Sequence, residues 1–290
     1  MTTEPSTQNI KIILAGWTIA VLWRIANGPI ERVMILLQTQ TANPRIQNGR
    51  ILPYTNGITC LIRVIEEQGA ISLWRGTLIN IIRYFSQQVL SFLFRDLCHS
   101  RLPRNYYLAD GLVDAATSII CYPLEIARVR FATDMTPGRP QYSGLFDLSL
   151  DILEERGLSG FFSGITSAMI SGLFHYSARW LFFTMQRYNP YRDEKSFRCR
   201  ISSFLIGTFS RFVFLPLSYP FDTVRRQLLS EVEVPSAEKQ QYGIIDGFNK
   251  ILRRDGIPGL YAGIGLELIH SLLVFASNEV VVQLFLGRMR

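Results

Sequence analysis

One pattern occurs three times in this chain, and it constrains the fold more than any other feature. The segments are YTNGITCLIRVIEEQGAISLWRG from Tyr54, YSGLFDLSLDILEERGLSGFFSG from Tyr142 and YGIIDGFNKILRRDGIPGLYAG from Tyr242. A second shared element precedes each of them: GPIERVMILLQ at Gly28, YPLEIARVRF at Tyr122 and YPFDTVRRQLL at Tyr219. The unit is roughly a hundred residues long. We therefore expect three structural repeats, at about residues 9–102, 103–195 and 196–290, in a single domain that covers 1–290.

Each unit contains two long apolar stretches, with a polar loop and a short amphipathic helix between them. Of the 290 residues, 48% are hydrophobic and the mean hydropathy is +0.17, which exceeds what a soluble domain of this size usually needs for its core. The windows 78–98, 165–186 and 264–286 are long enough to cross a bilayer at about 1.5 Å per residue. The sequence thus predicts an all-α membrane protein with six transmembrane helices in three pseudosymmetric pairs.

Charged side chains interrupt the first apolar stretch, residues 9–38. They are Arg24, Glu31 and Arg32. Charges that face lipid are costly, so we expect these three to face the interior of the helix bundle.

A proline in each unit is followed by an acid two positions later and, in two of the units, by a base three positions further on. The prolines are Pro29, Pro123 and Pro220, and the pairs are Glu31 with Met34, Glu125 with Arg128, and Asp222 with Arg225. Because proline bends a helix, three equivalent prolines can draw three helices together. We expect the acids and bases to link around a ring and close a passage of low dielectric constant. The alternative is that they are helix-end charges that meet lipid headgroups.

Several function classes are disfavoured by the charge pattern and the missing motifs. The net charge of +7 comes from scattered Lys and Arg, without the basic run or zinc-ligand spacing typical of nucleic-acid binding; anionic lipids or solutes fit better. His99, His175 and His270 lack metal-ligand spacing, so we expect no enzyme, metal or cofactor. The four cysteines lack the spacing of a metal site or a disulfide scaffold. The first residues, MTTEPSTQNI, have neither a basic n-region nor an Arg-rich amphipathic stretch, so we expect no cleavable presequence and an internal targeting signal.

The two repeated elements together resemble the mitochondrial carrier family over nearly the whole chain. They read Pro-x-[Asp/Glu]-x-x-[Lys/Arg] and, downstream, Gly-x-x-x-x-[aromatic]-[basic]-Gly. The downstream element begins at Gly69, Gly157 and Gly256, and its basic residue survives only in the first, as Arg75. The likeness is strongest to the ADP/ATP carrier branch, in PIERV and LLQ at 29–38, EQGAISLWRG and NIIRYF at 67–85, and SYPFDTVRR at 218–226. The signature of that branch, three arginines followed by three methionines, is degenerate here: Arg225 and Arg226 remain, and Gln227 takes the third place.

The resemblance implies a three-fold bundle whose central substrate site opens alternately to the cytosol and the matrix, with short helices on the matrix side. It implies a monomer in the inner membrane of a mitochondrion or a related organelle. It also implies that helix N-termini at Gly76, Gly164 and Gly263 hold cardiolipin phosphates. The expected function is exchange of ADP for ATP. The alternatives are transport of another nucleotide or phosphorylated anion, and a non-transporting membrane scaffold.

The candidate substrate contacts share one register. Arg83, Ser171 and His270 each lie seven positions after the last glycine of a downstream element, and the resemblance implies that these positions line the substrate site. The guanidinium of Arg83 suits bidentate contact with phosphate oxygens, although snorkelling to a headgroup is the alternative. His270 stands where the ADP/ATP carriers have an arginine. A histidine there would bind phosphate more weakly, or be satisfied within the bundle.

Other candidates lie beside these positions. Arg24 is two helical turns before Glu31 and supplies a second phosphate-binding cation. Gly172 fits the close approach of a flat base, and His175 or Tyr176 either stacks on an adenine or packs in the bundle.

Two charges lie eleven residues before signature acids. Asp114 precedes Glu125 and Arg211 precedes Asp222 by three turns of the same helical face. We expect Asp114 and Arg211 to pair with each other, or Arg211 to supply the phosphate contact that His270 weakens.

The resemblance also implies a matrix gate built from the Pro elements. Each acid would bond to the base of the next odd-numbered helix, Glu31 to Arg128 and Glu125 to Arg225, whereas Asp222 would meet the neutral Met34. Gln38 matches the glutamine that braces this layer.

The cytosolic gate implied by the resemblance is incomplete. Asp96 and His99 remain in the second helix and Arg187 in the fourth, where Thr184 replaces the acid; the sixth has Val282 and Gln283. A weak gate here would shift the population toward the cytosol-open state.

Overall fold

The computed structural model describes residues 7–49, 51–101, 106–136, 141–191, 197–230 and 243–274, and the regular structure in these ranges is entirely helical. The α-helices are α1 (Thr7–Thr39), α2 (Pro44–Gln47), α3 (Gly57–Gln68), α4 (Thr77–Arg101), α5 (Tyr106–Ile120), α6 (Tyr122–Thr133), α7 (Leu145–Arg156), α8 (Ile165–Arg187), α9 (Phe197–Ser230) and α10 (Ile244–Leu260). Short 3-10 turns are η1 (Gln40–Ala42), η2 (Ala70–Trp74) and η3 (Gly157–Phe162). A further helical segment, Ile264–Val274, follows α10.

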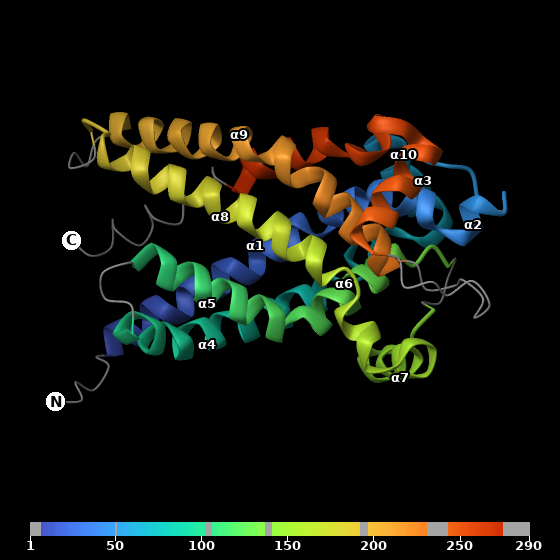
Figure 1. The fold of residues 1–290 in the computed structure, drawn as a ribbon, viewed down its shortest axis with the longest axis horizontal. Helices are drawn as coiled ribbons and strands as arrows, with labels where there is room; N and C mark the ends of the chain where they lie inside the picture. Colours follow the sequence, from blue (N-terminus) through green and yellow to red (C-terminus); the bar gives the residue numbers. More distant parts are fainter. Residues whose placement is uncertain are drawn as a thin grey trace.

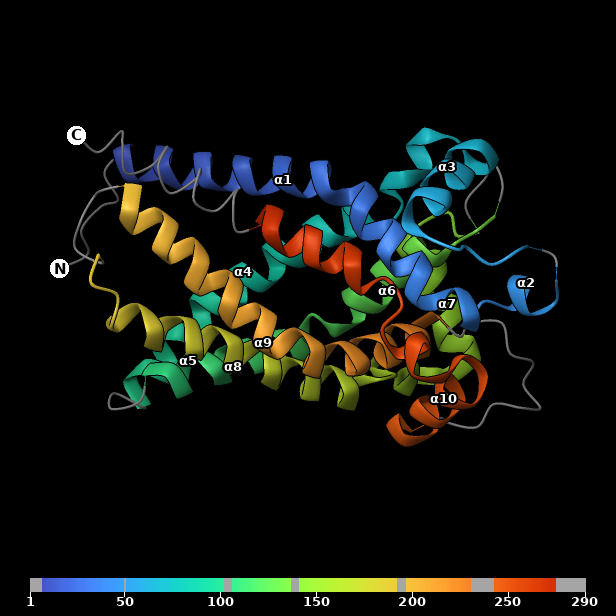
Figure 2. The same ribbon diagram turned by 90° about the horizontal axis from the view of Figure 1, so that it is seen from above.

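The long helices run along the long axis of the molecule, and the short ones gather at one end (Figures 1 and 2). α1, α4, α5, α8 and α9 form the body of the bundle, while α3, α7 and α10 lie together at what we call the short-helix end. α1 continues through Pro29 and α9 through Pro216 and Pro220. In the second repeat the helix is interrupted instead, between α5 and α6 at Cys121, just before Pro123. Short helices at one end recur in every repeat, and the long helices recur in the first two; in the third, the second long helix is described only over Ile264–Val274.

The glycines of the downstream elements adopt the same backbone conformation in each of the three repeats. Two glycines in each repeat have a positive φ, the region that favours glycine: Gly69 and Gly76, Gly157 and Gly164, Gly256 and Gly263. Gly69 and Gly157 follow the last residues of α3 and α7, and Gly256 kinks α10. The second glycine of each pair directly precedes α4, α8 or the segment Ile264–Val274. A common backbone requirement thus explains why glycine occurs twice in each unit.

Next to these glycines, tyrosine hydroxyls join the two halves of the same repeat. Tyr122 donates to the backbone oxygen of Ser163 at 2.8 Å, and Tyr219 donates to that of Ala262 at 2.7 Å. The first repeat has Gly28 at the tyrosine position, and Trp74 fills the space, since a Cβ on Gly28 would lie 2.9 Å from that indole. The first long helix of each repeat (α1, α5 with α6, or α9) is therefore anchored where the second (α4, α8 or Ile264–Val274) begins. Counted in this order and not by label, the first long helices are called odd-numbered and the second ones even-numbered.

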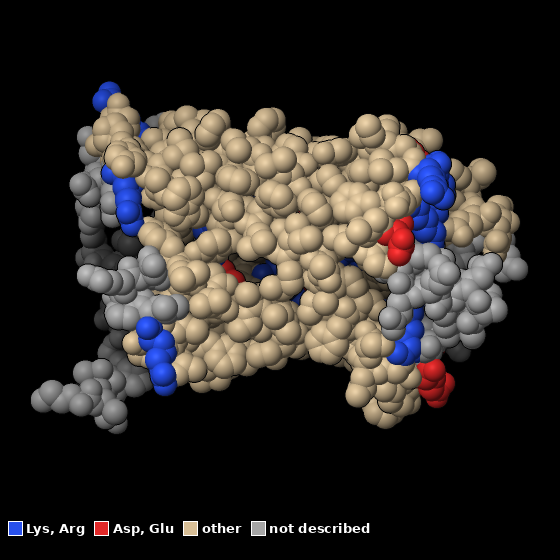
Figure 3. All heavy atoms as spheres, viewed as in Figure 1, with Lys and Arg blue, Asp and Glu red and all other residues tan. Residues whose placement is uncertain are grey.

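The surface of the bundle is apolar between two charged ends. Figure 3 shows Lys, Arg, Asp and Glu atoms mostly at the ends of the visible face, with an apolar band between them. By length and composition alone, two described helical stretches can cross a membrane, Gly157–Arg187 and Ile201–Ser230; a third, Ile244–Leu260 with Ile264–Val274, qualifies if a 50° bend is allowed. The sequence predicts six spans. The test of length and composition covers only the described residues, which leave out part of the predicted window 264–286.

A small core at the short-helix end joins α1 to α3. Cys60 and Val64 of α3 are fully buried against Leu36 and Leu37. Burial raises the pKa of the Cys60 thiol to about 12, and only the thiolate reacts readily with electrophiles.

We expect Cys60 to resist alkylation in the folded protein at neutral pH. Cys98 and Cys199, which are partly exposed, should be modified first, with Cys60 following only on unfolding. Peptide mass spectrometry after a timed maleimide pulse, with and without denaturant, measures this. Modification of Cys60 as fast as Cys98 in the folded state would contradict the packing of α3 on α1.

Candidate functional site

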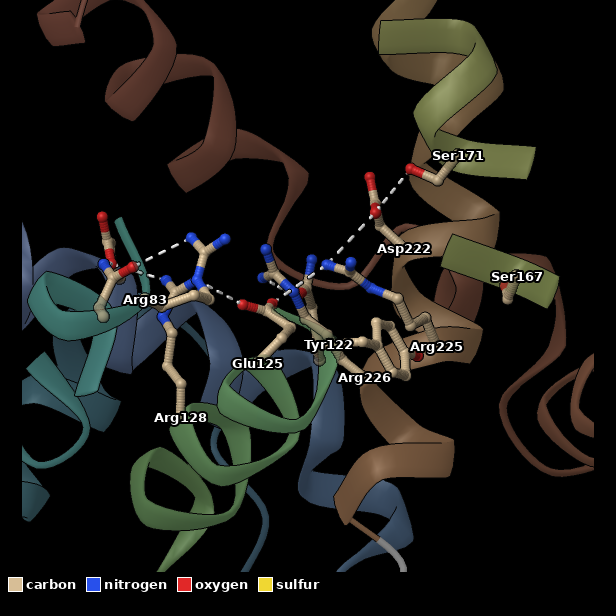
Figure 4. Close-up of polar contacts among 12 residues, drawn as sticks. Arg83, Tyr122, Glu125, Arg128, Ser167, Ser171, Asp222, Arg225 and Arg226 are labelled. Atoms are coloured by element: carbon tan, nitrogen blue, oxygen red, sulfur yellow. Dashed lines mark hydrogen bonds and ion pairs between the residues drawn. The ribbon is translucent and has the colours of Figure 1, made fainter. Parts of the chain in front are cut away.

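The three proline elements meet near the short-helix end, and two of the predicted ion pairs form there. Arg128 of α6 donates to Glu31 of α1 at 2.6 Å, and Arg225 of α9 lies 3.4 Å from Glu125 of α6. Figure 4 shows Glu125 between arginines from neighbouring helices. These pairs join α1 to α6 and α6 to α9. Their role as a gate stays a prediction.

The third acid is held in a way that the sequence did not predict. Asp222 accepts a hydrogen bond from the Ser171 hydroxyl at 2.7 Å and lies 3.1 Å from the Nε2 atom of His175. Both partners belong to α8. Met34, the residue expected opposite Asp222, is buried with 2% of its surface exposed. Asp222 is thus tied to the preceding even-numbered helix.

The seam between α1 and α9 is held closer to the short-helix end. Arg226 donates to the Gln38 side chain, and Gln227 donates to the Gln38 backbone oxygen at 3.0 Å and to Thr41 at 3.1 Å. Gln38 therefore joins α1 to α9 through Arg226 and Gln227, while its predicted bracing of the acid–base layer stays a prediction. The glutamine at position 227, which departs from the arginine signature, has a structural partner.

The predicted substrate contacts touch the acids of the proline elements. Arg83 of α4 lies 3.1 Å from Glu125, Ser171 of α8 bonds to Asp222, and His270 lies 3.7 Å from Glu31. In each case a side chain seven positions after a glycine meets the acid of the next odd-numbered helix. The two predicted layers are therefore in direct contact. Sequence spacing alone did not reveal this, because it fixes depth along a helix but not which neighbour a side chain reaches.

Asn80 is a polar residue of this site that the sequence reasoning missed. Its amide donates to Glu31 at 2.9 Å and its oxygen accepts from Arg83 at 3.1 Å. The signal was its position, one helical turn before Arg83. Asn80 thus connects the arginine of α4 to the acid of α1.

Arg24 lies on the same side of the bundle as Arg83. Its guanidinium sits over the Tyr84 ring, 3.9 Å from the centroid, and its buried Nε atom has no hydrogen-bond partner among the described residues. A cation held against an aromatic face keeps donors available for an anion. In Figure 3, positive and negative side-chain atoms are visible inside a hollow between the helices.

The aromatic candidates on α8 are engaged within the bundle. The Tyr176 hydroxyl donates to the backbone oxygen of Tyr107, and His175 contacts Asp222. Packing therefore describes Tyr176 better than a free stacking surface in this conformation. Gly172 has nothing within 4 Å of where a Cβ would stand, so the space beside it is open.

The expected pairing of Asp114 with Arg211 is wrong. Asp114 of α5 pairs with Arg179 of α8, whereas Arg211 of α9 donates to Glu267 at 2.7 Å and to Ser271 at 2.8 Å. Each charge is neutralised by the helix packed against it. The equal depth of Asp114 and Arg211 did not identify their neighbours.

At the end opposite the short helices, the predicted cytosolic-gate residues bond to α5. His99 lies 3.0 Å from Asp110, and Arg187 donates to the Tyr107 hydroxyl at 2.7 Å, while Asp96 is exposed. Val282 and Gln283 lie outside the described residues. Within the described ranges, these side chains link α5 to its two neighbours instead of pairing even-numbered helices with one another.

Comparison with known proteins matches the chain in three consecutive segments. The family model described as "Mitochondrial carrier protein" matches residues 6–106, 103–188 and 200–288. The chain is 32% identical to an ADP,ATP carrier protein of Parachlorella kessleri over 88% of this chain and 78% of the relative. It is 34% identical to mouse (Mus musculus) ADP/ATP translocase 4, over 87% and 82%, and 32% identical to human (Homo sapiens) ADP/ATP translocase 3, over 90% and 91%. The chain therefore belongs to the mitochondrial carrier family.

Proposed function

We propose that this carrier exchanges ADP for ATP across the inner mitochondrial membrane by alternating access. Members of its family are transporters, so the chain is a transporter and not an enzyme. The relatives named above are ADP/ATP carriers and translocases. The choice of these two nucleotides, the six spans in three pairs and the monomeric state belong to the proposal.

The observation that carries the proposal is the pair of arginines on adjacent helices. Arg24 of α1 lies over the Tyr84 ring of α4, and Arg83 of α4 donates to Asn80, so both guanidinium groups are oriented by α4 side chains. Guanidinium groups bind phosphate oxygens in bidentate geometry. Arg83 also contacts Glu125, so an incoming phosphate would compete with the acid that links α6 to α9. Phosphate binding and movement of these helices are thereby coupled.

Membrane lipids are proposed partners at the second glycines of the downstream elements. Gly76, Gly164 and Gly263 begin long helices, whose N-termini favour phosphate groups. Their positive φ already explains the glycines in structural terms. Cardiolipin binding at these positions is therefore a separate proposal, testable by thermal stabilisation with added cardiolipin compared with phosphatidylcholine.

Uptake into liposomes tests the substrate. Proteoliposomes loaded with ADP should take up labelled ADP and ATP, and should take up AMP and inorganic phosphate poorly. His270, which lies against Glu31, favours one alternative, a carrier of a less highly charged phosphorylated anion; preference for AMP or phosphate would establish it. Absence of uptake of all four solutes by folded protein would reject the proposal and favour a non-transporting scaffold.

Replacing Arg83 by glutamine should reduce ADP exchange by about a hundredfold. Truncating a buried, hydrogen-bonded charged partner costs about 2–5 kcal/mol, and each 1.4 kcal/mol is about tenfold. The control is Arg95→Gln on the same helix. The Arg95 side chain is 61% exposed, and its contact with Asp110 is long, at 3.8 Å. Initial uptake rates at several ADP concentrations measure both variants. Equal rates for the two would remove Arg83 from the substrate site.

A further inference from the structure

Both carboxylate oxygens of Asp222, the acid of the third proline element, are contacted by side chains of α8. Ser171 donates to Oδ1 of Asp222, and His175 lies against Oδ2. Among the described residues, the other cationic partner of Asp222 is Arg225 of its own helix, at 3.7 Å. Asp222 is 9% exposed, and a buried carboxylate requires such partners. The bonds from α8 are therefore what hold it across a helix interface.

The other two acids are held differently. Glu31 and Glu125 each receive an arginine from another odd-numbered helix, at 2.6 Å and 3.4 Å, in addition to a contact from an even-numbered one. The corresponding position opposite Asp222 is Met34, which supplies no charge. The α1–α9 seam instead relies on Gln38, Thr41 and Gln227, joined by neutral hydrogen bonds, and on Arg226.

We propose that Ser171 and His175 replace the missing cation and form the third closure at the short-helix end, between α8 and α9. This deepens the proposed function, on which it rests in taking that end as a gate. Ser171 also occupies the substrate register shared with Arg83 and His270. A solute phosphate or hydroxyl that bonds to Ser171 or His175 would therefore compete with Asp222 for these donors and release α9 from α8. No arginine–carboxylate pair between helices would have to break at this site.

The test measures opening of the short-helix end without any nucleotide. A reporter cysteine, Gln87→Cys, is placed one turn beyond Arg83, away from that end; Gln87 contacts Arg83 and Ser118. Cys98 and Cys199 are replaced by serine. A membrane-impermeant maleimide is added to oriented vesicles on the side of α3, α7 and α10. The rate of reporter modification then reports how often this end opens.

Removing both donors in Ser171→Ala/His175→Phe should raise the modification rate about tenfold or more, because hydrogen bonds to a charged group are worth more than neutral ones. Adding Met34→Lys, which restores a cation at the repeat position of Arg128 and Arg225, should bring the rate back toward the parent value. The matched control is Ser167→Ala. Ser167 joins the same two helices by donating to the Phe221 backbone oxygen at 2.7 Å but does not contact Asp222 (Figure 4), so its rate should stay unchanged.

An unchanged rate in the double variant would overturn the proposal, as would an increase that Ser167→Ala reproduces. If Met34→Lys prevents folding, the single variants Ser171→Ala and His175→Phe compared with Ser167→Ala still decide the question. Because no nucleotide is present, failure of ADP uptake leaves this result intact. In a second arm, added ADP should accelerate labelling of the parent; if only another phosphorylated solute does so, the closure stands and the substrate assignment falls.

Discussion

Replacing Glu125 by glutamine should destabilise the protein more than the same change at either of the other two signature acids. The Glu125 carboxylate lies 3.1 Å from Arg83, 3.5 Å from Arg128 and 3.4 Å from Arg225. It is buried, with 7% of the residue exposed. Without its charge, three guanidinium groups from three helices would face one another across a carboxamide. Removing one partner of a buried ion pair costs about 3–5 kcal/mol, and here one acid serves three bases.

Glu31→Gln is the matched control. Glu31 shares Arg128 with Glu125, and its other partners are the neutral amide of Asn80 and His270. Arg128 therefore retains a carboxylate in Glu31→Gln, whereas Arg83 loses its carboxylate partner in Glu125→Gln. Thermal unfolding of the detergent-solubilised variants should rank parent, Glu31→Gln and Glu125→Gln in descending order of midpoint. Equal midpoints for the two variants would show that Glu125 is not the centre of this network.

The fold could be predicted from the sequence because the repeat encodes local backbone requirements. Glycine recurs at paired positions such as Gly69 and Gly76 because both need a positive φ. Proline recurs at Pro29, Pro123 and Pro220, where the helices approach one another. Such requirements depend on the type of a single residue, so they can be recognised in the sequence without knowing its neighbours in space. The helix bounds, for example 77–101 for α4 against a predicted window of 78–98, follow from the same apolar patterning.

Contacts of the site could be predicted from the sequence only where the repeated proline element supplies both the acid and the base. The Glu31–Arg128 and Glu125–Arg225 pairs follow from the repeat, since equivalent acids and bases meet around a three-fold arrangement. Asp114 and Arg211 obey no such rule. Their equal spacing from the signature acids did not identify their partners, because the partner of each is the facing side chain of an adjacent helix, Arg179 for one and Glu267 for the other. Helix rotation and neighbour identity are tertiary properties that periodicity does not determine.

Departures from the repeat were the least predictable part. Met34 replaces the base that the repeat predicts opposite Asp222, yet Asp222 is contacted by Ser171 and His175 instead. Gln227 replaces the third arginine of the signature, yet its amide donates to Gln38 and Thr41. In both places a compensating contact comes from residues that the sequence had marked for another role, or not at all. A degenerate motif therefore does not by itself indicate a weakened closure.

Replacing Gly76 by alanine should impair both stability and transport. Gly76 has a φ of +87°, and a Cβ there would lie 2.8 Å from the backbone oxygen of Arg128. A left-handed conformation costs a non-glycine residue about 1–2 kcal/mol, and overpacking adds about 1–3 kcal/mol. Backbone cannot rotate away as a flexible side chain can, so α4 would have to move from α6. That shift would separate Arg83 from Glu125, which now join these two helices at 3.1 Å.

Gly164→Ala is the control, because Gly164 occupies the equivalent position in the second repeat. Its φ is +70°, but the nearest atoms to a Cβ would be 3.5 Å away, an ordinary contact. Both variants therefore carry the conformational strain, and only Gly76→Ala adds a collision with backbone. We expect a lower unfolding midpoint and slower ADP exchange for Gly76→Ala than for Gly164→Ala. If the two variants matched in both measurements, close packing of α4 on α6 would not be what positions Arg83 against Glu125.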